Sequence, residues 1–204
     1  RVKNNSYVES FFKYYISYTI KVTDLNTGEI AYEQPLDLKG KRVVVEMGSK
    51  SLGDTIAWFP YVEEFRKKHQ CEMVAITYNN SFFKNTYPDI TFLEPGVVVE
   101  NVFGWYEIGW FYDGGEFDKF RNPKEFKNQP MQKTASDILG LDFEEVKPKI
   151  DFTPKDRPSI AKPYVCIANH STCQAKYWNR PDGWQQLVNY LDSKGYEVLL
   201  LSKE

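Results

Sequence analysis

The chain has 204 residues and a formal net charge of −2, with basic and acidic residues interspersed along it. This length suits one large domain or one and a half typical domains, and the absence of an arginine-rich stripe argues against a dedicated nucleic-acid binder. No apolar run approaches the ~20 residues of a membrane span, and residues 1–10 lack the apolar core of a signal peptide, so we expect no membrane insertion.

Cysteine usage indicates a reducing compartment. Cys71, Cys166 and Cys173 form no C-x-x-C pair and no zinc spacing, so no metal site is predicted within this chain. An odd number of cysteines suits free thiols, which predicts a cytoplasmic protein. Because the chain begins at Arg1 without Met and stops in a strand-like run, we expect it to be a fragment of a longer protein.

Residues 1–40 predict a β-hairpin extension in front of an α/β domain. Apolar and polar residues alternate over residues 12–22, a turn follows at 24–28, and residues 29–33 form a second strand. The hairpin can simply extend or cover a sheet. Alternatively, its Tyr- and Phe-rich face is an assembly or protein-docking surface.

Residues 43–60 are the centre of the predicted domain at 41–150, and they read as a buried strand, a turn bracketed by Gly48 and Gly53, and the start of a helix. Their spacing is that of a Walker A loop, except that Asp54 replaces the phosphate-binding Lys. At ~4 Å and an effective dielectric constant of ~20, this exchange of attraction for repulsion changes the Coulomb energy by several kcal/mol, which argues against a triphosphate site.

Asp54 has two possible roles. Its carboxylate can accept a proton from an incoming hydroxyl as a general base, or it can cap the following helix. The residue type alone favours the cap, because Asp before Thr-Ile-Ala-Trp is an ordinary helix start.

The next elements complete a βαβ unit. We predict a helix over residues 54–68 that Pro60 kinks, a strand over 73–78, a short helix over 79–87 and a strand over 90–93.

The stretch 104–115 is about half aromatic and is interrupted by glycines, so it forms either a core strand followed by a loop or a hydrophobic lid. Trp105, Tyr106 and Trp110 are candidates for an acceptor groove, since sugars and extended peptides lie on aromatic platforms. Residues 132–139 predict a helix that Gly140 ends.

A proline-containing linker at 151–163 separates this domain from the start of a second α/β domain at 164–204, with a strand over 164–168, a helix over 184–193 and a strand over 198–201. Ser171, Thr172 and Lys176 follow its first strand, at the carboxyl end where ligands bind. Two hydroxyls and one cation suit a diphosphate, although Ser-Thr pairs in polar loops are common and a single Lys is usually solvated.

Taken together, these motifs resemble the ADP-heptose glycosyltransferases of glycosyltransferase family nine. The resemblance is carried by residues 48–66 and by the pattern Ser171-Thr172-x-x-x-Lys176-x-Trp178. Three further stretches look like the branch that glycosylates bacterial autotransporter adhesins: 106–112, 132–140 and 170–173.

The resemblance implies a GT-B-like architecture of two Rossmann-like domains, the second incomplete here. It also implies an inverting transfer of heptose from ADP-heptose to serine hydroxyls of an adhesin polypeptide, without a cofactor for catalysis. By this resemblance Asp54 is the general base, and Ser171, Thr172 and Lys176 bind the donor. Gly48, Ser51, Leu52 and Gly53 then form the active-site loop.

The family also implies features that this chain does not contain. Contacts to adenine and heptose and a cysteine-rich metal finger are expected beyond Glu204, and a homo-oligomer is expected by analogy. Two alternatives stay open: a heptosyltransferase of the lipopolysaccharide core, and a non-catalytic nucleotide-sugar-binding or assembly module.

Overall fold

The computed structural model describes residues 2, 5–7, 9–153, 159–171 and 173–201. The chain divides into two compact units, Arg1–Phe152 and Thr153–Glu204. No helix among these described residues is both long and apolar enough to cross a membrane.

Unit 1 begins with an antiparallel hairpin of β1 (Thr19–Thr23) and β2 (Ile30–Pro35). Its turn is set by Asp24, whose Oδ1 accepts hydrogen bonds from the backbone N–H groups of Asn26 and Thr27. The predicted strand over residues 12–22 is wrong in its first half. There, the backbone N–H groups of Lys13 and Tyr15 donate to the carbonyls of Phe120 and Ile138, so this stretch is fastened to the domain instead of to β2.

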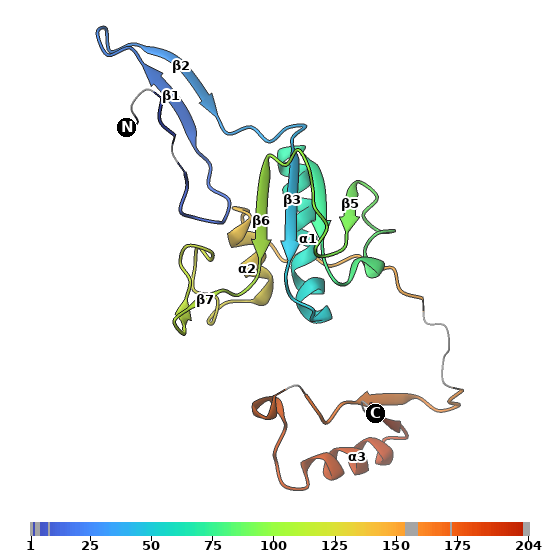
Figure 1. The fold of residues 1–204 in the computed structure, drawn as a ribbon. Coiled ribbons are helices and arrows are strands. Elements are labelled where there is room, and N and C mark those ends of the chain that lie inside the picture. The colour runs from blue at the N-terminus through green and yellow to red at the C-terminus, as the bar shows by residue number, and fades with distance from the viewer. Residues whose placement is uncertain (1, 3–4, 8, 154–158, 172, 202–204) are drawn as a thin grey trace. The chain divides into compact units, whose positions relative to one another are not determined.

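The core of unit 1 is a parallel sheet in the order β5-β4-β3-β6 (Figure 1). These strands are β3 (Arg42–Met47), β4 (Glu72–Ile76), β5 (Ile90–Leu93) and β6 (Gly104–Ile108). The β-branched run of β3 is buried on both faces, as a central parallel strand requires. The predicted βαβ unit is therefore confirmed.

Two helices cover one face of this sheet: α1 (Leu52–His69) and α2 (Met131–Ile138). Trp58, Phe59 and Phe65 of α1 pack against β3 and β4 in the main core cluster. The other face carries a smaller cluster of Val44, Val74 and Ile76, covered in part by residues 99 and 102. Pro60 lies inside α1, which continues through it to His69.

Short elements complete unit 1. The predicted helix at 79–87 is reduced to a 3-10 turn, η1 (Asn80–Phe82), because Asn80 is occupied by hydrogen bonds to Thr77, Leu93 and Glu94. After β6, the glycine-rich stretch forms a small hairpin of β7 (Tyr112–Asp113) and β8 (Glu116–Phe117). The predicted end of α2 is confirmed, since Gly140 follows it with φ +61°.

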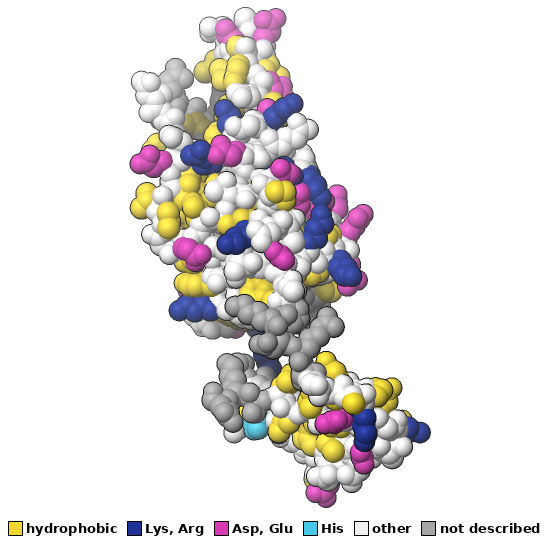
Figure 2. All heavy atoms as spheres, turned by 90° about the vertical axis from the view of Figure 1, so that its right-hand side faces the viewer, with side chains coloured by type: hydrophobic (Ala, Val, Ile, Leu, Met, Phe, Trp, Pro, Cys, Tyr) yellow, Lys and Arg dark blue, Asp and Glu magenta, His cyan; other side chains and the backbone are white. Residues whose placement is uncertain are grey.

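Unit 2 contains one βαβ unit, with β9 (Tyr164–Ile167), η2 (Gln174–Lys176), α3 (Gly183–Ser193) and β10 (Glu197–Leu200). The two strands are parallel, as predicted. Many of its large apolar side chains are exposed, and Figure 2 shows yellow side chains gathered on this unit. The exposed set comprises Tyr164, Trp178, Tyr190, Tyr196, Leu200 and Leu201.

Candidate active site

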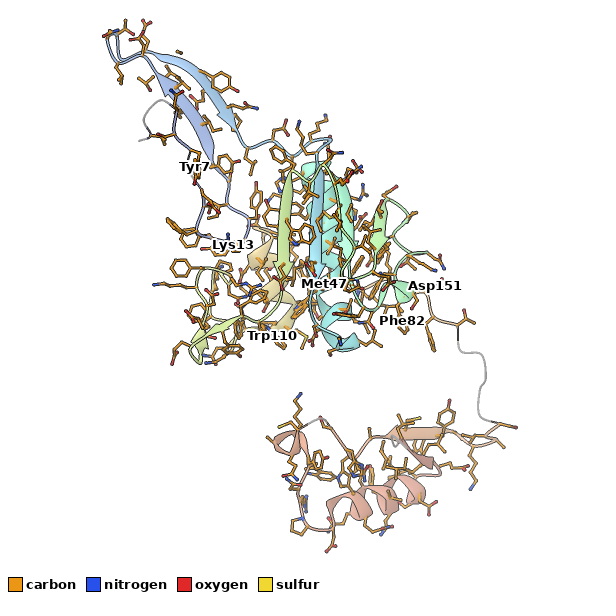
Figure 3. All side chains as sticks on the ribbon, viewed as in Figure 1. Tyr7, Lys13, Met47, Phe82, Trp110 and Asp151 are labelled. Atoms are coloured by element: carbon orange, nitrogen blue, oxygen red, sulfur yellow. The ribbon has the colours of Figure 1, made fainter. Side chains whose placement is uncertain are left out.

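The candidate site of unit 1 lies at the carboxyl end of β3, where the chain turns into α1. Figure 3 labels Met47, the last residue of β3, and Trp110, which follows β6, near the same edge of the sheet. Because all four strands are parallel, the loops after them meet at this edge, which is where open α/β sheets bind ligands.

Asp54 is part-buried in the first turn of α1, and its Oδ2 accepts a hydrogen bond of 2.6 Å from Ser49 Oγ. The Ser49 hydroxyl in turn accepts the backbone N–H of Ser51 at 3.1 Å. The carboxylate is thus held by a defined donor at the positive end of the helix.

The interpretation of Asp54 as the helix cap is wrong in position. The N-cap is Ser51, with an extended backbone, so Asp54 is the third residue of the helix. Leu52 and Gly53 precede Asp54 within the helix. A carboxylate in the first turn still favours the helix dipole, so Asp54 has a structural as well as a chemical use.

A second set of hydrogen bonds joins the loop to the end of β4. Thr55 is fully buried, and its Oγ1 donates to the Ser51 carbonyl at 3.2 Å. The same hydroxyl accepts from Asn79 Nδ2 at 2.9 Å, and the Asn79 backbone N–H donates to Thr77 Oγ1. These hydrogen bonds attach the turn that carries Asp54 to the end of the neighbouring strand, β4.

The third predicted set, the candidate acceptor groove, is not brought together on one surface. Trp105 and Tyr106 are neighbours in β6 and point to opposite faces of the sheet. Trp105 is exposed and donates to Glu46 at 3.2 Å, whereas Tyr106 packs in the core on Tyr15 and Phe65. Burial raises the pKa of Tyr106 to about 12, which suits a core side chain.

Trp110 lies beyond the end of β6 and remains partly exposed. Its ring meets Trp58 of α1 edge-on at 5.3 Å between centroids, and its Nε1 donates to Thr134 of α2 at 3.3 Å. Tyr106 also contacts α1, through the buried Phe65, whereas Trp110 contacts α1 through Trp58 and keeps part of its ring exposed.

The sequence reasoning missed an ion pair at this edge. Arg121 bonds to the Glu107 carboxylate, and the other Glu107 oxygen lies 3.4 Å from the position that a Cβ on Gly48 would take. The Glu107 carboxylate therefore faces Gly48, in the loop that carries Asp54. A lone acid near the end of a predicted strand was the one sequence signal for it.

In unit 2, the predicted donor loop follows β9. Ser171 and Lys176 are both exposed, and Thr172 lies outside the described residues. Lys176 ends the short turn η2, in which its own N–H donates to the Cys173 carbonyl at 3.0 Å. Trp178 packs edge-on against Trp184 at the start of α3, with ring centroids 5.1 Å apart.

Comparison with solved structures defines the class of protein. The structure is similar to that of TibC from enterotoxigenic Escherichia coli H10407, a bacterial iron-containing dodecameric glycosyltransferase, with a TM-score of 0.81 and 32% identity over 97% of this chain and 51% of TibC. TibC has also been solved in complex with ADP-D-beta-D-heptose, and that structure gives a TM-score of 0.81. The α/β fold is thus that of about half of a glycosyltransferase chain.

Curated relatives narrow this class. The chain is 32% identical to the autotransporter heptosyltransferase BAHTCr of Citrobacter rodentium over 98% of its length, and 34% identical to Aah of Escherichia coli over 97%. It spans about half of each relative, 49% and 50%. The chain is therefore homologous to the autotransporter heptosyltransferases, which confirms the resemblance. No protein-family model matches the sequence.

One further relative and the iron of TibC bear on the chemistry. BimC of Burkholderia thailandensis, 29% identical over 94% of this chain, is named an inactive autotransporter heptosyltransferase. Within the part of the chain that the structure describes, no three His, Cys, Asp or Glu side chains lie close enough to hold a metal ion. The described residues therefore do not fit an iron site.

Proposed function

We propose that the full-length protein transfers heptose from ADP-heptose to serine hydroxyls of an autotransporter adhesin, with inversion and with Asp54 as general base. The observation that carries this proposal is the homology to autotransporter heptosyltransferases together with a part-buried carboxylate at the ligand-binding edge of the sheet.

The proposed step is a single displacement. The serine oxygen forms a bond to the anomeric carbon as the bond from that carbon to the ADP oxygen breaks, and the serine proton passes to Asp54. Ser49 holds one oxygen of Asp54, which fixes the orientation of the carboxylate that would accept the proton. Leu52 and Gly53 form the first turn of α1 beside it.

Ser171, Thr172 and Lys176 are proposed to bind the departing diphosphate. A lysine and two hydroxyls stabilise the negative charge that develops on the leaving group. The exposure of Ser171 and Lys176 supports this role, because both side chains are available to a ligand. The complete GT-B-like arrangement of two Rossmann-like domains is part of the same proposal.

The hairpin of β1 and β2 supports a protein acceptor or a homo-oligomer. All of its residues are exposed, and Ile20, Val22 and Tyr32 lie on one face. A lipopolysaccharide-core heptosyltransferase has no evident need for such an apolar, unpaired edge. TibC is dodecameric, and we propose that this protein also forms a homo-oligomer.

The test is a transfer assay with the full-length protein. ADP-heptose is supplied with either an adhesin repeat or a lipid-linked core acceptor, and ADP release and the mass of the acceptor are measured. Heptose on serine of the adhesin supports the proposal, whereas transfer only to the lipid-linked acceptor supports the core enzyme.

The name of BimC makes a non-catalytic module the second candidate. Calorimetry separates it from the enzyme, since a module binds ADP-heptose but turns over on neither acceptor.

A further inference from the structure

Glu107 and Arg121 form an ion pair beside the loop of the candidate site. Both side chains are about one third exposed, 35% and 38%, so the pair is reachable from solvent at the ligand-binding edge. The Arg121 guanidinium also lies over the Phe111 ring, with its Cζ 3.6 Å from the ring centroid. An arginine that is both stacked and paired is held in one orientation.

The segment that carries Arg121 is itself closed by buried hydrogen bonds. Asn122 is 1% exposed, and its side chain donates to the Gly109 carbonyl and accepts from the Phe111 backbone N–H. Gly109 has no Cβ where the Phe111 ring folds back, since a Cβ there would lie 2.9 Å from the ring. The 109–122 segment is thus a fixed support for Arg121.

Charge repulsion explains why Glu107 needs this partner. Glu107 stands directly opposite Glu46 on the neighbouring strand, and paired positions on adjacent strands face the same side. Glu46 accepts a hydrogen bond from Trp105, while Glu107 is neutralised by Arg121. Without Arg121, the Glu107 carboxylate would be repelled by Glu46 and would be free to move from its place beside Gly48.

We propose that the Glu107–Arg121 pair positions the loop of Asp54. The connection runs from the Arg121–Glu107 ion pair to the Glu107 oxygen that faces Gly48, and through the next residue, Ser49, to Asp54. Both members are positioning residues, because they act on the base through the loop. This inference rests on the proposed transfer reaction for its kinetic consequence.

The kinetic test uses the full-length protein with ADP-heptose and the adhesin repeat. In Arg121→Gln, kcat falls by up to about 10-fold, because the displacement reaches Asp54 through the Ser49 hydrogen bond. If the pair acts only through the loop, the KM values for donor and acceptor stay unchanged. Lys119→Gln is the matched control, because Lys119 lies on the same turn and contacts the Phe120 ring instead of the loop.

A double variant separates positioning from independent effects. If Arg121 acts through the Ser49–Asp54 hydrogen bond, Arg121→Gln costs little further activity once Ser49→Ala has removed that bond. Additive losses overturn the inference, as does a raised acceptor KM with unchanged kcat. Arg121→Lys, which keeps the charge but not the stacked fork, provides an intermediate loss if Arg121→Gln does not fold.

Hydrogen exchange provides a readout that does not depend on transfer. We expect faster amide exchange in the peptide covering residues 48–54 in Arg121→Gln than in Lys119→Gln, because the Ser51 N–H donates to Ser49. If the wild-type protein transfers no heptose, the proposed function fails while this exchange result still decides the inference. If it transfers heptose and Arg121→Gln matches the wild type in both kcat and exchange, only the inference fails.

Discussion

Two loops of this protein occupy the same place in their βαβ units and differ in construction. The loop after β3 carries a part-buried carboxylate that is held by Ser49 and connected to β4 through Thr55. The loop after β9 exposes Ser171 and Lys176, and its described polar contacts are short backbone turns. Side-chain hydrogen bonds hold the first loop, whereas backbone turns hold the described residues of the second.

This difference fits the two tasks in the proposed reaction. A general base must be held close to one proton, so disorder in its position lowers the rate directly. A lysine side chain can bind a diphosphate without being fixed beforehand, because the charge of the ligand orders the side chain at the time of binding. The contrast predicts that changes in the first loop alter kcat and that changes in the second alter donor affinity.

Asp54→Asn has the largest expected effect. Removal of a general base lowers kcat by about 10²-fold to about 10⁴-fold, while donor binding and folding persist because the amide keeps the size of the side chain. The measurement is ADP release with mass analysis of the adhesin. The control is Glu64→Gln on the same helix, where the carboxylate pairs with Lys67 and lies outside the loop. Full turnover by Asp54→Asn would remove the base from the mechanism.

Lys176→Gln is expected to act on affinity. A charge-assisted hydrogen bond contributes about 1.5–3 kcal/mol, so the dissociation constant for ADP rises by about 10-fold to about 150-fold. Calorimetry with the full-length protein measures this change, and raised salt is expected to shrink the difference from wild type. Lys194→Gln is the matched control, because Lys194 lies at the C-cap of α3 and contacts the Tyr190 ring. Equal affinities for ADP would exclude Lys176 from the donor site.

Ser49→Ala is expected to have a smaller effect on the first loop. Loss of one hydrogen bond to a charged acceptor of about 1.5 kcal/mol corresponds to a fall in kcat of roughly 10-fold, with unchanged affinity for ADP. Ser81→Ala serves as a control, because Ser81 is an exposed serine of η1. If Ser49→Ala lowered ADP affinity and left kcat intact, the assignment of the two loops to separate tasks would be wrong.

The sequence alone predicted the elements with strong local patterns. The β-branched run of β3, the glycines after it and the apolar face of α1 together determine the β3-α1-β4 unit, and the turn at Gly140 follows from its left-handed backbone. The position of Asp54 at the ligand-binding edge follows from that unit. These features depend on residues close together in the chain.

The features that were missed depend on long-range contacts. Arg121 and Glu107 are 14 residues apart in an aromatic stretch with no periodic pattern, so their pairing could not be read from spacing. The first half of the predicted hairpin strand is similar. Tyr15 occupies the space left by Gly140, where a Cβ would collide with its ring, and this packing overrides the alternating pattern.

The smallest expected effect concerns two thiols that report the same contrast between a packed and an exposed region. Cys71, directly before β4, is 6% exposed, and burial raises its pKa to about 11, whereas Cys173 is exposed in the loop after β9. Since the thiolate is the reactive form, N-ethylmaleimide at about pH 8 should modify Cys173 and spare Cys71 in the folded protein. Peptide mapping of the labelled full-length protein measures both sites separately.

Burial of Cys71 also determines how the unfolding free energy depends on pH. The folded pKa of Cys71 lies above its ordinary value of 9.0, so the protonated thiol favours the folded state. This contribution is complete below the unfolded pKa and is lost as the pH rises from about 9 toward about 11. Cys71→Ala should therefore flatten the decline of the unfolding free energy across this range.

Labelling of Cys71 as fast as Cys173 at about pH 8 would show that β4 opens under native conditions. The hydrogen bonds of Thr55 and Asn79, which connect the Asp54 turn to β4, would then hold that turn less rigidly than their geometry indicates.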